Sequence, residues 1–365
     1  MTGDPVGAAP PTDPRREPVL SVRDLRTTFV MDTGVVEAVR GVSFDLYPGE
    51  ILGLVGESGS GKSALVSSVM GLLRSPPANV GGGPVTFGGR NLLTESKAAM
   101  RRVRGEEIAM IFQDPMTSFN PVRSIGQQIS EAIRVHHRVS RRAAKARTVE
   151  LLALVGMPSP TVRYAQFPHE FSGGMRQRAM IAMAMANQPK VIIADEPTTA
   201  LDVTVQAQIL QILQAAQAET DAAILLITHD LGLVAELADR VLVMYAGRVV
   251  ESSDVFSLFA GPKHPYTLGL LASLPRIGLE VDQLVSIPGR PPSLSPPPLA
   301  CAFRARCQLS HARERCRVED PALRLVGDGH ASACHFSDEM AAGADLAAGG
   351  GVDGVSVDGA REPLR

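Results

Sequence analysis

The segment "ILGLVGESGSGKSALV", residues 51–66, joins an apolar run to a glycine-rich turn and then to an amphipathic stretch. The apolar run predicts a β-strand over residues 51–55, and the amphipathic stretch predicts a helix that begins near Lys62. The turn between them has the spacing G-x-x-x-x-G-K-S of a phosphate-binding P-loop. Backbone N–H groups in such a turn, together with the positive end of the helix dipole, bind phosphate oxygens. The sequence therefore predicts an α/β fold of the P-loop NTPase class.

The P-loop residues have separate expected tasks. Lys62 is expected to reach the β- and γ-phosphates of ATP, and the hydroxyl of Ser63 is expected to bind Mg²⁺. The predicted nucleotide contacts of the loop are Gly56, Glu57, Ser58, Gly59, Ser60, Gly61, Lys62 and Ser63.

A second apolar run, "KVIIADEP", ends in two adjacent acids, Asp195 and Glu196. Such a run is typical of a fully buried parallel strand, and ligands of open α/β sheets bind at the carboxyl ends of the strands. We expect Asp195 to hold Mg²⁺, directly or through water. Glu196 lies one residue farther, where it is expected to act as general base on the attacking water.

Two more predicted strands end in polar residues. "AAILLITHD", residues 222–230, places His229 just beyond its apolar run, and "EIAMIFQDP" ends near Gln113. A single histidine at a strand end is more often structural than catalytic, but the other strand ends favour a position facing the γ-phosphate. The amide of Gln113 is expected to bind Mg²⁺ or the attacking water.

The polar corner "FSGGMRQR", residues 171–178, precedes the predicted helix "AMIAMAMA". It has two glycines and a serine at the head of a helix but no obvious nucleophile, acid or metal ligand. These features suit anion binding by backbone N–H groups without catalysis.

Composition restricts the class of protein. The chain has 365 residues, 45% of them hydrophobic and 20% charged, with a formal net charge of −2. This length favours two domains, and the charge argues against a large non-specific nucleic-acid surface. No apolar run approaches the roughly 20 residues that span a bilayer, and the first residues lack the apolar region of a signal peptide. A cytosolic location is expected, with any membrane role supplied by other subunits.

The ends of the chain differ from its middle. Residues 1–17 and residues 338–365 have compositions typical of disordered tails. Between them we expect a large unit over residues 18–260 and a small unit over residues 261–337. The proline-rich residues 287–300 are expected to form an extended linker.

The ordered motifs resemble those of ATP-binding cassette (ABC) ATPases. Residues 56–63, Gln113, "FSGGM", "ADEP", "TALD" at residues 199–202, and His229 occur in that family's order. The resemblance covers about residues 19–260 and implies an ABC transporter nucleotide-binding subunit. It also implies an antiparallel β subdomain and a helical subdomain over about residues 115–185.

The resemblance assigns further residues to the nucleotide. It implies that Ser172, Gly173 and Gly174 contact the γ-phosphate bound on a second cassette and that Asp202 lies across that interface. It places Phe29 where the family stacks an aromatic ring on adenine, although a single phenylalanine is equally consistent with the core. Phe171 and Met175 depart from the commonest signature, and peptide importers commonly have "SGGMRQR".

The small unit narrows the resemblance. "GPKHPYTLGLLASLPR", residues 261–276, and "IPGRPPSL" resemble the C-terminal extension of oligopeptide, dipeptide and nickel importer ATPases. The resemblance implies a motor for import of di- or oligopeptides, with nickel or another small solute as the alternative. It implies a second cassette, identical or homologous, two transmembrane permease subunits and an extracytoplasmic solute-binding protein. The expected location is peripheral, on the cytoplasmic face of the cell membrane, with no nucleic acid.

All four cysteines lie in the small unit, at Cys301, Cys307, Cys316 and Cys334. Clustered thiols in a cytosolic chain favour metal binding over disulfides. The spacing is not the paired C-x2-C of a zinc ribbon; four thiolates suit an iron–sulfur cluster or zinc, and unpaired buried thiols are a third possibility.

Similar importer ATPases include members with a [4Fe–4S] cluster, which is therefore expected here, with zinc as the alternative and His335 as a less favoured ligand. Because the small unit is far in sequence from the ATP motifs, we expect replacement of a cysteine to leave ATP binding intact.

Other functions have less support. The basic residues 134–147 predict a solvated helix, because they include no aromatic side chain for stacking on bases. A DNA-repair or chromosome ATPase would have a long coiled coil between its P-loop and its signature, and the chain has no sustained heptads there. A translation factor with two cassettes would need a second P-loop. A zinc knuckle that binds nucleic acid would require zinc and affinity for RNA.

Overall fold

The computed structural model describes residues 17–32, 34–199, 202–274, 287–310 and 313–341. The predicted disordered tails therefore lie almost wholly outside the described residues. The predicted C-terminal tail overlaps the described residues at positions 338–341. A short helical turn, η6 (Ser337–Ala341), covers these positions. Met340 in this turn is buried, so order extends slightly farther than the composition indicates.

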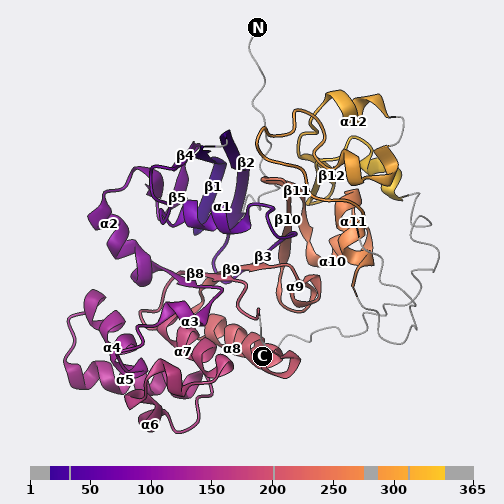
Figure 1. Ribbon diagram of the computed structural model, residues 1–365. Helices are drawn as coiled ribbons and strands as arrows, with labels where there is room; N and C mark the ends of the chain where they lie inside the picture. The colour runs from indigo at the N-terminus through magenta and orange to yellow at the C-terminus, as the bar shows by residue number, and fades with distance from the viewer. Residues whose placement is uncertain (1–16, 33, 200–201, 275–286, 311–312, 342–365) are drawn as a thin grey trace.

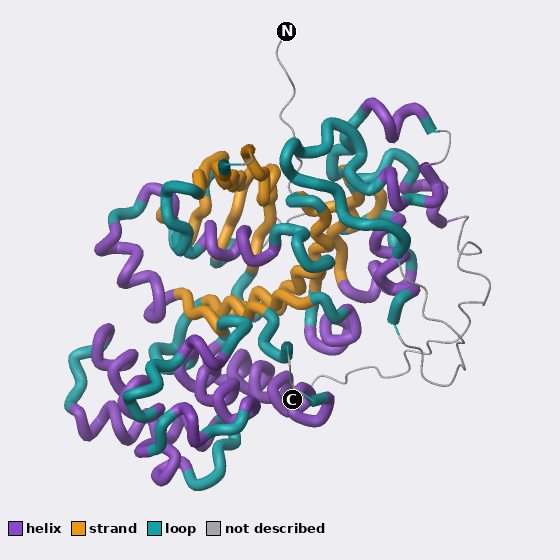
Figure 2. Tube along the Cα trace, in the orientation of Figure 1, coloured by secondary structure: helices purple, strands orange, loops and turns teal. Residues whose placement is uncertain are grey.

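The centre of the molecule is an eight-stranded sheet with the order β12-β13-β11-β10-β3-β9-β8-β7 (Figures 1 and 2). The bounds of these strands are β3 (Ile51–Val55), β7 (Ile108–Ile111), β8 (Val191–Asp195), β9 (Ala223–Thr228), β10 (Arg240–Tyr245), β11 (Arg248–Asp254), β12 (Arg324–Gly327) and β13 (His330–Ser332). The run from β10 through β3, β9 and β8 to β7 is parallel. Strands β3, β8 and β9 at its centre are buried at every position, as expected of a parallel sheet covered on both faces.

A second, antiparallel sheet has the order β2-β1-β5-β6, with β4 paired to β1. The bounds of its strands are β1 (Leu20–Met31), β2 (Gly34–Leu46), β4 (Ala78–Gly82), β5 (Val85–Phe87) and β6 (Arg90–Asn91). Helix α1 (Lys62–Val69) packs against β1 and β2, and the buried hydroxyls of Thr27 and Ser68 lie 2.7 Å apart at this contact. This sheet corresponds to the antiparallel β subdomain that the resemblance implies.

A group of helices lies below the central sheet in Figure 1. Their bounds are α3 (Pro115–Ser118), α4 (Ile125–His136), α5 (Arg141–Leu154), α6 (Pro160–Ala165) and α7 (Gly173–Ala184). The expectation of one helix over residues 134–147 is wrong, because α4 ends at His136 and α5 begins at Arg141. Ser140 separates the two helices by accepting a hydrogen bond from the backbone N of Ala143 at 3.1 Å, which caps α5.

The remaining helices lie outside this group. Their bounds are α2 (Lys97–Arg102), α8 (Val203–Thr220), α9 (Leu231–Leu237), α10 (Val255–Ala260), α11 (Pro265–Ala272) and α12 (Glu314–Val318). Short helical turns are η1 (Leu92–Thr94), η2 (Val103–Glu107), η3 (Pro168–Glu170), η4 (Arg304–Arg306) and η5 (Gln308–Ser310). None of the described helices is both long and apolar enough to cross a membrane.

The register of the parallel strands brings their carboxyl ends to one edge. Val55 pairs with Thr228, and Asp195 pairs with Ile227. The P-loop after β3, the acids at the end of β8 and His229 after β9 must therefore meet at this edge. This is how the sheet assembles the site.

The C-terminal region pairs directly with the large sheet. β13 pairs with β11, where Glu251 lies opposite Ser332. The proline-rich residues have no helix or strand, but Glu37 on β2 donates its backbone N–H to the carbonyl of Leu294 at 3.1 Å. The structure thus corrects the expectation that these residues only space the two units.

Candidate functional site

The P-loop turns through conformations that favour glycine. Gly61 has φ of 106°, and a Cβ built at this position would lie 2.3 Å from the carbonyl oxygen of Ala38. A side chain here would require both a left-handed backbone and a clash with main chain. Glycine therefore lets α1 begin at Lys62 directly after the turn, with its N-terminus at the edge of the sheet.

Lys62 lies within the curve of the loop. Its Nζ donates to the carbonyl of Gly56 at 2.6 Å and to that of Glu57 at 3.1 Å, and the residue is only 5% exposed. Burial lowers the pKa of Lys62, and the negative charges of Glu196, Asp195 and Glu57 oppose this shift. The loop thus holds a buried cation beside the two acids at the end of β8.

Asp195 has the features of a cation ligand. It is 7% exposed, and among the described residues its buried Oδ1 has no hydrogen-bond partner. Burial raises the pKa of Asp195, and the charge of Glu196 adds to the shift, whereas the hydroxyl of Ser63 and the charge of Lys62 oppose it. A buried carboxylate oxygen next to a hydroxyl matches the oxygen donors that Mg²⁺ prefers. These residues therefore fit the predicted ion.

Glu196 is held at the centre of the site. Its backbone has φ of +46°, a strained conformation for a residue other than glycine, and its backbone N donates to the carbonyl of Ile227 at 2.9 Å. Its Oε2 accepts hydrogen bonds from Gln113 Nε2 at 3.0 Å and from Thr199 Oγ1 at 2.8 Å. Its Oε1 lies 3.6 Å from His229 Nδ1.

The structure therefore brings together the residues predicted from three strand ends, and it adds Thr199. That threonine is the first residue of the "TALD" stretch, but nothing in the local sequence indicates that its hydroxyl binds Glu196. The other predicted positions are farther from this centre. Phe29 is half-buried on β1, two residues beyond Thr27, which contacts α1.

The polar corner at residues 171–178 forms the N-terminus of α7. Ser172 caps this helix, with its Oγ accepting from the backbone N of Met175 at 3.3 Å, and Ser172 and Gly173 are exposed. In Figure 1, α7 and α1 lie on opposite sides of β8 and β9. The structure does not bring the corner to the P-loop of the same chain. Asp202 is likewise exposed and caps α8, accepting from the backbone N of Val205 at 2.9 Å.

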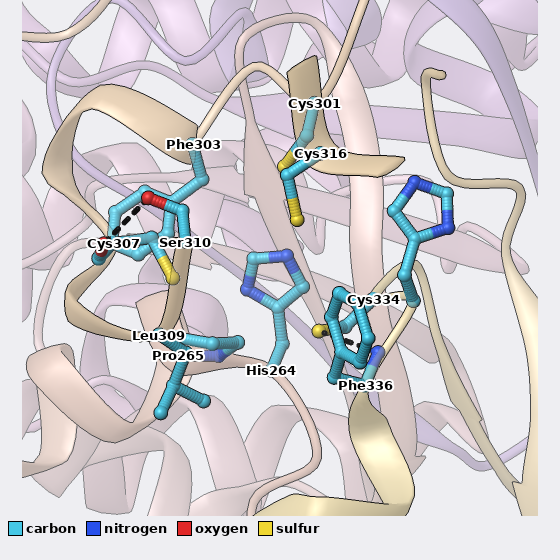
Figure 3. A pocket seen from close by; sticks show the side chains of 11 residues that line it. His264, Pro265, Cys301, Phe303, Cys307, Leu309, Ser310, Cys316, Cys334 and Phe336 are labelled. Atoms are coloured by element: carbon cyan, nitrogen blue, oxygen red, sulfur yellow. Dashed lines mark hydrogen bonds between the residues drawn. The ribbon is translucent and has the colours of Figure 1, made fainter. Parts of the chain in front are cut away.

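The four cysteines surround one hollow, although they come from separate segments (Figure 3). Its lining includes Cys301, Cys307, Cys316 and Cys334, together with His264, Phe303, His335 and Phe336. All four thiols are free of disulfides. His335 is turned partly away, because its Nε2 lies 3.1 Å from the carbonyl oxygen of Glu319.

The surroundings of the sulfur atoms combine burial with backbone donors. Burial raises the pKa of Cys301 to about 12 and that of Cys334 to about 11. Backbone N–H groups nevertheless point at these sulfurs, from Phe303 to Cys301 and from Phe336 to Cys334, the latter at 3.4 Å. Cys307 receives two such donors, from Leu309 and Ser310.

Within the described residues, no three His, Cys, Asp or Glu side chains stand close enough together to hold a single metal ion. The thiols therefore line a volume without converging on one point. The expectation of a metal-binding cysteine cluster stays a prediction at this stage.

Comparison with known proteins gives two family matches in separate parts of the chain. The profile of the ABC transporter family matches residues 39–199, and that of the oligopeptide/dipeptide transporter C-terminal region matches residues 250–316. The chain is 51% identical to the oligopeptide transport ATP-binding protein OppD of Bacillus subtilis (strain 168) over 86% of this chain and 87% of that protein. It is 49% identical to the dipeptide transport ATP-binding protein DppD of the same organism over 89% of this chain and 96% of that protein.

Solved structures share the cassette fold. A bacterial ABC transporter cassette, MJ0796, described as dimeric, aligns with a TM-score of 0.58 and 25% identity over 65% of this chain and 98% of that one. CbiO1 of Clostridium perfringens, described as part of the ABC transporter complex cbiONQ, aligns with a TM-score of 0.58 and 27% identity over 67% of this chain and 91% of that one.

Proposed function

The chain belongs to the ABC transporter family, whose ATP-binding subunits hydrolyse ATP to power transport, and on that premise we propose that it drives the import of di- and oligopeptides. The observation that carries the motor role is the meeting of Lys62, Asp195 and Glu196 at one edge of the sheet. The peptide class is supported by the C-terminal match and by relatives that are named for oligopeptide and dipeptide transport.

The geometry suggests how the residues divide the work. Gln113 and Thr199 occupy Oε2 of Glu196, which leaves Oε1, on the side of His229, to accept a proton from the attacking water. We propose that His229, whose side chain is 62% exposed and lies 3.6 Å from Glu196, faces the γ-phosphate next to that water. Mg²⁺, held by Ser63 and Asp195, would supply positive charge to the phosphates when bound.

The exposed corner at the head of α7 supports a second cassette as partner, and the family matches support the membrane subunits. Ser172 and Gly173 are exposed at the N-terminus of α7, and in Figure 1 this helix lies on the other side of β8 and β9 from α1, which suits a phosphate bound on a second cassette. We propose a pair of cassettes, with Asp202 at their interface, joined to two permease subunits and supplied by an extracytoplasmic solute-binding protein. The chain would then be a peripheral protein on the cytoplasmic face of the cell membrane.

Placing aspartate at Gly173 tests this arrangement. The isolated Gly173→Asp chain is expected to bind ATP with the parent affinity, because Gly173 belongs to the partner's nucleotide site. In the assembled transporter the added negative charge would repel the partner's γ-phosphate and prevent closure of the two cassettes. ATP-dependent dimerisation by light scattering measures closure, and Ala146→Asp on the exposed face of α5 is the control. Loss of ATP binding by the isolated variant would contradict the assignment across the interface.

The solute is tested in the complete transporter. Vesicles that contain this chain, its permeases and its binding protein are expected to accumulate labelled dipeptide only when ATP is present on the side of the cassettes. Accumulation of nickel without peptide would contradict the proposal and select the alternative solute.

We also propose that the cysteine hollow holds a [4Fe–4S] cluster. The raised pKa values of these thiols mean that a bound metal would convert them to thiolates, and the backbone N–H groups directed at Cys301, Cys307 and Cys334 would stabilise that charge. Zinc is less well matched, because its four ligands converge to about 2.3 Å from one ion. A cluster is larger and suits thiols spaced around a hollow.

Metal analysis of anaerobically purified protein tests the cluster. About four iron and four labile sulfide ions per chain are expected, with broad visible absorption. Cys316→Ser is expected to lose most of this iron, whereas His335→Ala should keep it, since the imidazole is hydrogen-bonded elsewhere. Stoichiometric zinc without labile sulfide would show that the cysteines bind zinc and not a cluster. The absence of both metals would show that the thiols are free.

A further inference from the structure

The C-terminal region reaches the P-loop through one buried arginine. Arg306 in η4 donates from Nη1 to Glu57 Oε2 at 2.7 Å and from Nη2 to Glu57 Oε1 at 2.9 Å. Glu57 is the second residue of the P-loop, and the two partners are 249 positions apart in sequence. A paired contact of this kind fixes both the distance and the plane of the carboxylate.

The arginine is itself firmly held. Its side chain is 4% exposed, its Nε donates to the carbonyl of Pro288 at 3.0 Å, and its guanidinium lies 5.8 Å from the ring centroid of Tyr245. The hydrogen bonds to Glu57 raise the pKa of Arg306, so its charge is constant at any physiological pH. A flexible surface ion pair would have none of this support.

A second contact from the same region meets the same P-loop residue. The hydroxyl of Tyr266 in α11 accepts a hydrogen bond from the backbone N of Glu57 at 2.8 Å. The rings of Tyr266 and Tyr245 have centroids 4.6 Å apart, and Phe303 packs against both. Glu57 is therefore held by its side chain and its main chain at once, while its carbonyl accepts from Lys62.

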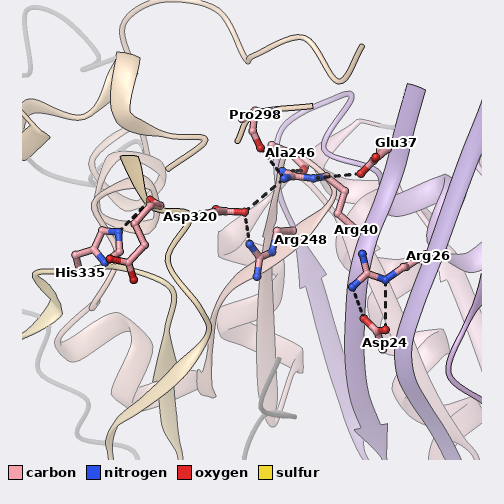
Figure 4. Close-up of polar contacts among 10 residues, drawn as sticks. Asp24, Arg26, Glu37, Arg40, Ala246, Arg248, Pro298, Asp320 and His335 are labelled. Carbon is pink, nitrogen blue, oxygen red and sulfur yellow. Dashed lines mark hydrogen bonds and ion pairs between the residues drawn. The ribbon is translucent and has the colours of Figure 1, made fainter. Parts of the chain in front are cut away.

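Other contacts dock the region beside this clamp. Asp320 forms ion pairs with Arg40 of β2 and Arg248 of β11, and Arg40 also donates to the carbonyl of Pro298 at 2.9 Å (Figure 4). Pro291, Pro292 and Leu294 line a hollow with the P-loop residues Glu57 to Ser60. The region is thus placed where it can control the conformation of the P-loop.

We propose that Arg306 is a positioning residue for the nucleotide site and that, with Tyr266, it holds the P-loop in its phosphate-binding conformation. Lys62 donates to the carbonyl of Glu57, so holding Glu57 also holds the lysine that is expected to reach the phosphates. The inference rests on the proposed function only in requiring that the P-loop binds ATP.

The clamp also joins the nucleotide site to the cysteine hollow. Arg306 lies between Cys301 and Cys307 in the sequence. Arg304, the first residue of η4, donates its backbone N–H to the carbonyl of Cys301 at 3.2 Å, and its own carbonyl accepts from the backbone N of Cys307 at 3.3 Å. A change that disorders this segment would release Arg306 from Glu57. The expectation that cysteine replacements leave ATP binding intact rests on the distance in sequence between the small unit and the P-loop. The contact of Arg306 with Glu57 brings the two close in space, so that distance no longer supports the expectation.

Arg306→Met in the full chain is the main test. Methionine removes the charge and both hydrogen bonds but keeps an apolar stem of similar length, and the partner it leaves, Glu57, has a side chain that is 28% exposed. The ATP dissociation constant from calorimetry is expected to rise about ten-fold. In the assembled transporter KM for ATP should rise more than kcat falls, because the residue acts on the loop and not on the reacting water. Arg306→Lys should recover only part of the affinity, since an ammonium cannot form the fork.

Arg315→Met is the matched control. Arg315 also directly precedes a cysteine, Cys316, and its ion pair with Glu319 is exposed, so its loss should change ATP affinity by less than about two-fold. Parent ATP affinity for Arg306→Met would overturn the proposal. Equal weakening by Arg306→Met and Arg315→Met would overturn it too, because the effect would then come from general loss of charge beside the cysteines.

Glu57→Gln breaks the same ion pair from the P-loop side and covers the case in which Arg306→Met does not fold, and parent ATP affinity for Glu57→Gln would overturn the clamp. Where both single variants fold, they also form a double-mutant cycle. Glu57→Gln leaves the buried Arg306 without its charge partner, so it should weaken ATP binding, and Arg306→Met combined with Glu57→Gln should lose less than the sum of the two. Additive losses would overturn the clamp. Tyr266→Phe reads out the second contact and should weaken ATP binding about three-fold, and an unchanged affinity would overturn its part in the clamp. A parent chain that binds no ATP would instead refute the proposed motor function.

Discussion

Glu196→Gln is expected to slow ATP hydrolysis by about 10² to 10⁴-fold and to leave ATP affinity nearly unchanged. The amide oxygen of glutamine can still accept the hydrogen bonds from Gln113 and Thr199, so the strained turn at this position keeps its contacts. The new amide cannot take a proton from water at the position of Oε1. The phosphate contacts of the P-loop are untouched, and the closed, ATP-bound pair of cassettes should therefore accumulate.

The measurement compares steady-state phosphate release and ATP affinity in the assembled transporter. Glu236→Gln, which changes an exposed carboxylate on α9, is the control and should behave as the parent. Phosphate release by Glu196→Gln at the parent rate would refute the assignment of Glu196 as general base. A parallel loss of ATP affinity would show instead that Glu196 mainly supports the site.

Lys62→Ala is expected to act on binding, raising the dissociation constant for ATP by about 10- to 100-fold. Loss of a charge-assisted contact to phosphate costs about 1.5–3 kcal/mol, and 1.4 kcal/mol corresponds to about ten-fold in affinity. The side chain also joins the carbonyls of Gly56 and Glu57, so its removal should loosen the loop before nucleotide arrives. Both effects weaken ATP binding.

Calorimetry on the isolated chain measures this effect, and thermal unfolding without nucleotide shows how much of it comes from the loop. Lys97→Ala, at an exposed position on α2, removes the same charge away from the site and should leave the affinity unchanged. An ATP affinity equal to that of the parent in Lys62→Ala would contradict the role of Lys62 in phosphate binding.

Sequence alone determined the parts of this protein that depend on local chemistry. The apolar runs of β3, β8 and β9 and the glycine-rich turn before Lys62 follow from periodicity and from the backbone freedom of glycine. Because parallel strands end at one edge of a sheet, the sequence alone assigns their polar ends to one site. The resemblance extended this reasoning to the residues that face a second cassette.

Only the tertiary structure decided which groups hold that site in place. Arg306 and Tyr266 contact Glu57 from segments whose local sequences carry no sign of the P-loop. Thr199 lies only three residues after Glu196, but which side chain its hydroxyl contacts is set by the turn between them. The sequence does not show that Arg306 is buried or that its partner is Glu57. The two residues are 249 positions apart, and only the folded chain brings them together. The same reason explains why the proline-rich residues looked like a linker in the sequence, whereas the folded chain packs them against the P-loop.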